Sequence, residues 1–96
     1  MHVRVTRGQW ADPTTFDSEA GQQLLQELVA AMKGAPGNQS YLTGADRASG
    51  RTVAISTWDT EDHARAALTA IGDIASRLQT LGLRIDPSEF FEVITT

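Results

Sequence analysis

The segment Arg51-Thr-Val-Ala-Ile-Ser-Thr-Trp58 alternates along its length and is rich in β-branched residues, which favours a half-buried strand. Asp59-Thr-Glu-Asp62 follows directly and predicts a helix start. Asp59 or Thr60 can accept hydrogen bonds from the free amides of the first turn, and the acidic residues suit the positive end of the helix dipole. Beyond it, apolar residues three and four positions apart predict one buried stripe. They are Ala64, Ala67, Leu68, Ile71, Ile74, Ala75 and Leu78.

Strands and a second helix are expected on both sides of this segment. Residues 2–9 alternate around two valines and predict a first strand, and residues 18–33 predict a helix that ends at Gly34 in a left-handed cap. Residues 37–46 form the weakest predicted strand, joined to the next by the hairpin loop 46–50. The helix after Trp58 closes near Thr80. A short extended segment around residues 81–85 and a last strand at 89–95 complete the chain.

Length and composition predict one domain spanning residues 1–96. The chain has no cysteine and only two histidines, so no disulfide, thiolate chemistry or metal site is expected. A net charge of −4 with scattered basic residues argues against nucleic acid as a partner. No apolar run is long enough to span a membrane, and the N-terminus lacks the apolar centre of a signal peptide, so we expect a cytoplasmic protein.

The predicted order is strand, helix, strand, strand, helix, strand. This order is the α+β, ferredoxin-like βαββαβ arrangement, in which a four-stranded antiparallel sheet carries both helices on one face. We expect these apolar side chains of the first, third and last strands to face the helices: Val3, Val5, Val53, Ile55, Phe91 and Val93. The other face then carries Arg4, Thr6, Ala54, Ser56, Trp58, Phe90, Glu92 and Ile94, a mixed surface too apolar to remain in water.

The element order, the small size and the segment Val53-Ala-Ile-Ser-Thr-Trp-Asp-Thr-Glu61 resemble the dimeric α+β barrel superfamily, most closely its antibiotic biosynthesis monooxygenase group. The resemblance implies a homodimer in which two sheets pack face to face, and a pocket between sheet and helices or within the barrel. The mixed face is then both dimer surface and cavity wall.

Several chemistries occur in that superfamily, and fold alone does not choose among them. Haem-degrading members carry an axial histidine about ten positions after the strand-three tryptophan, where this chain has Leu68, and an asparagine on the first strand, which is absent here. Haem degradation is therefore not expected. The resemblance to the monooxygenases implies chemistry without a cofactor, with Arg4, Trp58 and Tyr41 as candidate catalytic residues.

Each candidate residue also has a purely structural interpretation. Trp58 can stack on an aromatic ligand and donate its indole N–H, or it can lock strand to helix. Arg4 and Glu92 share a face of neighbouring strands, where Arg4 can hold an oxyanion or form a buried ion pair with Glu92. Tyr41 can donate a phenolic proton or pack at a sheet edge. The candidate ligand-binding residues are Trp58, Arg4, Phe90, Glu92 and Ser56.

Two functions from different classes follow. The first is a cofactor-independent monooxygenase-like homodimer that binds a small aromatic or polyketide-like molecule in an apolar cavity. The sequence does not decide whether it is an enzyme. The alternative is a non-catalytic, ligand-binding or stress-associated dimer of the same fold. A weaker third hypothesis is an isomerase that uses His2 or His63 as a base.

Overall fold

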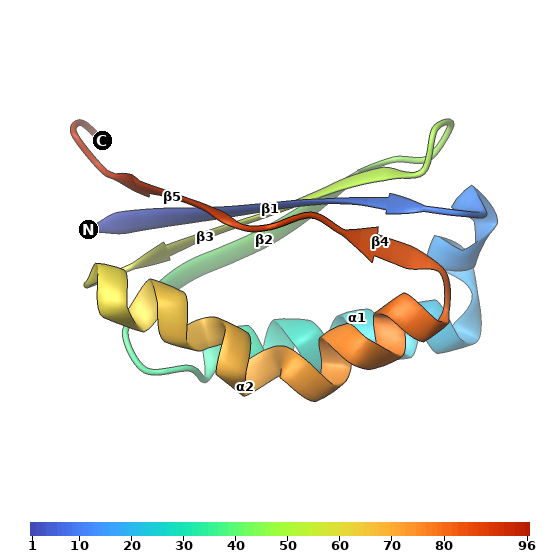
Figure 1. Cartoon of the computed structure of the whole chain (residues 1–96), viewed down its shortest axis with the longest axis horizontal. Coiled ribbons are helices and arrows are strands. Elements are labelled where there is room, and N and C mark those ends of the chain that lie inside the picture. The colour runs from blue at the N-terminus through green and yellow to red at the C-terminus, as the bar shows by residue number, and fades with distance from the viewer.

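The computed structural model describes residues 1–96 as one sheet with two helices packed against one of its faces (Figure 1). Both chain termini lie at the same end of this layer (Figure 1). The elements in chain order are β1 (His2–Trp10), the short 3-10 helix η1 (Pro13–Asp17), α1 (Glu19–Lys33), β2 (Asn38–Asp46), β3 (Arg51–Trp58), α2 (Glu61–Thr80), β4 (Leu83–Ile85) and β5 (Glu89–Glu92).

The sheet order is β2-β3-β1-β4. β5 also pairs directly with β1, at the start of that strand, whereas β4 pairs with its end. All of the pairings are antiparallel. The predicted ferredoxin-like βαββαβ fold is therefore confirmed, with a sheet of five strands rather than four. The expected extended segment near Leu83 joins the sheet as β4. β4 and β5 both pair with β1, and residues 86–88 separate them.

The helix boundaries follow from local capping. The Ser18 hydroxyl accepts a hydrogen bond from the Gly21 amide, and the Thr60 hydroxyl accepts one from the His63 amide, both at 3.1 Å. Thr60, rather than Asp59, is thus the cap of α2. Gly34 ends α1 with a right-handed φ of −87°, so the expected left-handed cap is wrong. The left-handed residue is Gly37, with φ +80°, which turns the chain into β2.

The assignment of the sheet faces is reversed relative to the sequence prediction. Cross-strand pairing places Arg4 opposite Ser56, and both side chains are buried on the helix side. Val5 pairs with Ile55 on the uncovered side, next to Leu42, which is 58 % exposed. The uncovered face carries more aliphatic side chains, including Val3, Val5 and Ile55, so hydropathy alone favours the wrong face for burial under the helices. The helices cover the face that carries the two tryptophans, which are the largest side chains and need the deepest burial.

The core consists of two clusters within the layer between sheet and helices. One holds Met32, Trp58, Ala64, Ala67 and Ile71, and the other holds Trp10, Leu24 and Leu78. Trp58 is fully buried, and its indole N–H donates a 2.8 Å hydrogen bond to the Ser56 hydroxyl, which is also buried. This bond satisfies the one polar atom of the indole ring. Trp58 is therefore a core residue that joins β3 to α2.

We predict that Trp58→Ala lowers the free energy of unfolding by about 3–5 kcal/mol, because it empties the centre of this cluster. Ser56→Ala should cost about 1–3 kcal/mol, because it leaves the indole N–H buried without a partner. Urea denaturation of the two variants measures both values. Ser56→Ala can also be made in a Trp58→Phe background, which has no indole N–H. An equal loss of unfolding free energy in that background would contradict the assigned role of the hydroxyl.

Candidate functional site

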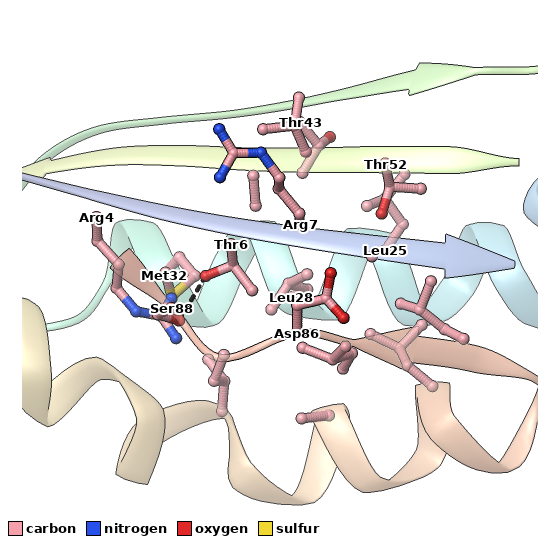
Figure 2. Close-up of a pocket in the computed structure, with 18 of the residues that line it drawn as sticks. Arg4, Thr6, Arg7, Leu25, Leu28, Met32, Thr43, Thr52, Asp86 and Ser88 are labelled. Atoms are coloured by element: carbon pink, nitrogen blue, oxygen red, sulfur yellow. Dashed lines mark hydrogen bonds between the residues drawn. The ribbon is translucent and has the colours of Figure 1, made fainter. Parts of the chain in front are cut away.

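A cavity of about 570 Å³ lies between the sheet and the two helices (Figure 2). Its volume falls in the range of sites for drug-sized ligands. Its walls are mainly apolar, with Leu25, Leu28 and Met32 contributed by α1, and Ile71 and Ala75 by α2. The cavity therefore has the size and apolar character of a small-molecule site.

The cavity exists because the middle of the sheet carries small side chains on its covered face. Thr6 pairs with Ala54, and Ala54 pairs with Thr43, so three short residues lie in one row across β1, β3 and β2. Gly8 and Thr52 form the next pair toward Trp10. The large core residues lie in the two clusters, and the space over this row is not filled by side chains.

Arg4 is the most unusual residue in the cavity wall. Its side chain leaves β1 toward the helices (Figure 2), and the residue is only 4 % exposed. It makes no hydrogen bond or salt bridge within the chain, and its Nε atom is enclosed without a partner. Burial lowers the pKa of the Arg4 guanidinium from its ordinary value. Arginine side chains nevertheless keep their charge in proteins. Every other arginine is paired with a carboxylate, namely Arg7, Arg47, Arg51, Arg65, Arg77 and Arg84.

Arg4 belongs to a second row across the sheet. Tyr41 pairs with Ser56, Ser56 with Arg4, and Arg4 with Phe90. The small Ser56 leaves room between the two long polar side chains. Burial raises the pKa of Tyr41 to about 12, an effect that the charge of Arg4 partly offsets. The phenol is therefore protonated at neutral pH and can serve as a hydrogen-bond donor, but not as a base.

Further polar and charged groups line the same cavity. The hydroxyls of Thr6 and Ser88 are hydrogen-bonded at 2.6 Å (Figure 2). Asp86 is half-buried and pairs with Arg84 at 3.3 Å. Arg65 lies over the ring of Phe90, at 4.3 Å from the ring centroid, and also pairs with Glu61. The charged groups other than Arg4 are thus neutralised by neighbours within the chain.

The structure brings some of the predicted site residues together and separates others. Arg4, Tyr41 and Phe90 line the cavity. Trp58 and Ser56 lie beside it in the core, bonded to each other. Glu92 is exposed and pairs with His2 in register, and no Arg4–Glu92 ion pair forms. The interpretation of Arg4 and Glu92 as a buried ion pair is therefore wrong, because Glu92 lies two register pairs away from Arg4, at the exposed end of the sheet.

The sequence pattern predicted Thr6 and Ala54 on the face expected to form a cavity wall, but it did not identify a row of small residues as the cause of the cavity. The short row of Thr6, Thr43 and Ala54 carries a usable signal, since small residues in the middle of three neighbouring strands indicate a gap in packing. That signal becomes visible only when the register of the strands is known. Trp10 also lines the cavity, as part of the second core cluster.

Neither histidine lies in the cavity wall. The His63 Nδ1 atom is hydrogen-bonded at 2.7 Å to Asp59 at the exposed start of α2. His2 is half-buried, with an enclosed Nδ1 that has no partner. No group of three or more His, Asp or Glu side chains is arranged to hold a metal ion. Neither helix combines the length and apolar character that crossing a bilayer requires.

The fold is shared with several solved structures. SnoaB, a cofactor-independent oxygenase from Streptomyces nogalater, has a TM-score of 0.77 and 19% identity, with 99% of this chain and 94% of that chain covered. A putative antibiotic biosynthesis monooxygenase from Deinococcus radiodurans has a TM-score of 0.79 and 16% identity, covering 100% and 95%. Rv0793 from Mycobacterium tuberculosis has a TM-score of 0.73 and 12% identity, covering 100% and 98%.

These similarities define the class of protein by its architecture. The chain has the ferredoxin-like α+β fold of the antibiotic biosynthesis monooxygenase structures, as the sequence resemblance predicted. A comparison of the sequence with protein family models gave no match, and neither did a comparison with curated proteins. At these identities the likeness establishes the fold alone.

The buried phenol gives a measurable prediction, because Tyr41 is the one tyrosine of the chain. We expect its phenolate absorbance to appear with a midpoint near pH 12 in the folded protein, against about 10 in denaturant. The neutral phenol is favoured in the folded state, so stability is unaffected below pH 10 and falls as pH rises through the folded pKa.

Arg4→Met should raise the Tyr41 midpoint further, because the charge of Arg4 lowers that pKa in the native protein. Arg51→Met, which removes an exposed charge on the uncovered face, is the matched control and should leave it unchanged. An identical midpoint in Arg4→Met and the native protein would contradict the proximity of Arg4 and Tyr41.

Proposed function

We propose that this protein binds a small, mainly aromatic molecule in the cavity between sheet and helices, and that it oxidises this molecule with O₂ without a cofactor. The apolar cavity of about 570 Å³ carries the proposal. The shared fold with SnoaB, a cofactor-independent oxygenase, gives it a reaction type. Arg4, Tyr41 and Phe90 are the proposed site residues, and Trp58 acts through the position of β3.

An activated aromatic methylene group illustrates the proposed reaction. Loss of one proton gives a carbanion, which transfers an electron to O₂ and combines with it to form a carbon–oxygen bond in a hydroperoxide. Loss of water then leaves a ketone. One oxygen atom ends in the product and the other in water, so the substrate itself is the only reductant. The protein has to bind this anion, orient it and keep it away from bulk water.

Oxygen uptake with the anthrone dithranol tests this function, since its methylene group reacts by this route. We expect uptake well above the uncatalysed rate, with formation of the matching anthraquinone. Ala54→Phe should reduce uptake at least about tenfold, because the new ring fills the cavity above the row of Thr6, Ala54 and Thr43. Ala66→Phe, at an exposed position of α2, is the matched control and should retain the activity.

Binding of dithranol without uptake would favour the alternative, a non-catalytic ligand-binding protein. The specific observation behind that alternative is that no free carboxylate or histidine in the cavity can act as base: Asp86 is paired with Arg84, and Tyr41 is protonated. Uptake that persists in Ala54→Phe would contradict the location of the site.

We also propose that the uncovered face of the sheet is the contact between two copies of this chain. Leu42 and Phe91 are 58 % and 51 % exposed, and they flank the pairs Val5–Ile55 and Val3–Thr57. A contiguous apolar patch of this kind is typical of an interface. A two-fold contact can bury the same patch on both copies.

Ile55→Glu should convert the dimer to a monomer, because it buries two unpaired charges near the centre of that contact. Light scattering coupled to size exclusion measures the mass in solution. Ala66→Glu, at an exposed site on α2, serves as the control and should remain dimeric. A native protein that runs as a monomer at all concentrations would contradict the proposed contact.

A further inference from the structure

The guanidinium of Arg4 lacks a counter-charge in the folded chain. It is 4 % exposed, its Nε atom has no partner, and no carboxylate lies within salt-bridge distance. Buried charges are ordinarily paired, because removing an ion from water is unfavourable without compensation. The unpaired charge lies in the wall of a cavity with room for a ligand, so the missing partner can come from outside the chain.

The other charged groups around the cavity do not need a partner. Arg7 pairs with Glu89, Arg65 pairs with Glu61 and lies over Phe90, and Asp86 pairs with Arg84. Among the charged groups that line the cavity, one therefore has no counter-charge within the chain, and that charge is positive.

We propose that the cavity is selective for organic anions, and that Arg4 is the counter-ion of the ligand's anionic oxygen group. This inference rests on the proposed small-molecule site and adds the charge of its ligand. The anionic group lies in the row of Tyr41, Ser56, Arg4 and Phe90. The apolar body extends past Thr6 toward Leu28 and Trp10, along the direction in which the cavity follows β1.

The side chains beside Arg4 fit such a group. Guanidinium donors match the geometry of carboxylate, enolate and sulfonate oxygens. Tyr41 lies two strands away in the same row and provides a neutral donor, and Phe90 provides an apolar wall on the other side of Arg4. An acid that binds here is stabilised in its ionised form, so the ligand is held as the anion.

A matched pair of fluorescent probes tests the proposal. Anilinonaphthalenesulfonate and N-phenylnaphthylamine share the same aromatic body and differ by one sulfonate group. We expect the protein to bind the anionic probe at least about tenfold more tightly than the neutral one. Arg4→Met should remove this preference and leave the affinity for the neutral probe within about twofold. Arg51→Met, which removes an exposed and paired charge, should keep the preference.

The outcomes separate this inference from the proposed function on which it rests. If the native protein binds both probes equally and Ala54→Phe binds neither, the anion selectivity is overturned and the cavity site is retained. A preference that survives in Arg4→Met would also overturn it. Probe binding that is insensitive to Ala54→Phe would overturn both proposals.

Folding of the Arg4 variant is checked by its thermal midpoint without ligand. We expect an equal or higher value than in the native protein, because the substitution removes an unpaired buried charge. Should Arg4→Met fail to fold, Arg4→Lys keeps the charge and should retain the preference for the anionic probe, although more weakly. If a folded Arg4→Lys variant loses all preference for the anionic probe, the positive charge alone does not explain the selectivity, and the proposed counter-ion role is overturned.

Discussion

The burial of Trp58 against the start of α2 controls the thickness of the layer between sheet and helices. The indole ring packs in one cluster with Ala64 and Ala67, whose small side chains let the helix approach the sheet closely. Its N–H is bonded to Ser56 on the same strand, so the ring can be fully enclosed without an unsatisfied donor. Because Thr60 caps α2 only two residues after Trp58, the strand and the helix are positioned together.

The cavity is a consequence of this arrangement. Large residues hold the two ends of the layer apart at a fixed distance, while Thr6, Thr43 and Ala54 in the middle of the strands are too short to fill it. A well-packed domain of this size would place larger aliphatic side chains there. Such local departures from good packing are expected at functional sites, and the unpaired charge of Arg4 is a second departure at the same place.

Parts of this site could be predicted from the sequence. Arg4, Tyr41 and Phe90 were candidates because each combines a polar or aromatic group with a strand position, and all three line the cavity. Trp58 and Ser56 were candidates for the same reason, yet they satisfy each other in the core. Local sequence does not reveal that difference, because it depends on which atoms of two neighbouring strand residues meet in space.

The order and the ends of the elements follow from local sequence, since capping residues, glycines and hydrophobic periodicity act over a few positions. The face of the sheet that the helices cover does not. Alternation separates Val3, Val5 and Ile55 from Arg4, Ser56 and Trp58, and hydropathy favours the first set for the helix side, although the helices cover the second. Packing of the helices decided it, since only one arrangement encloses both tryptophans, and that choice placed Arg4 inside the protein.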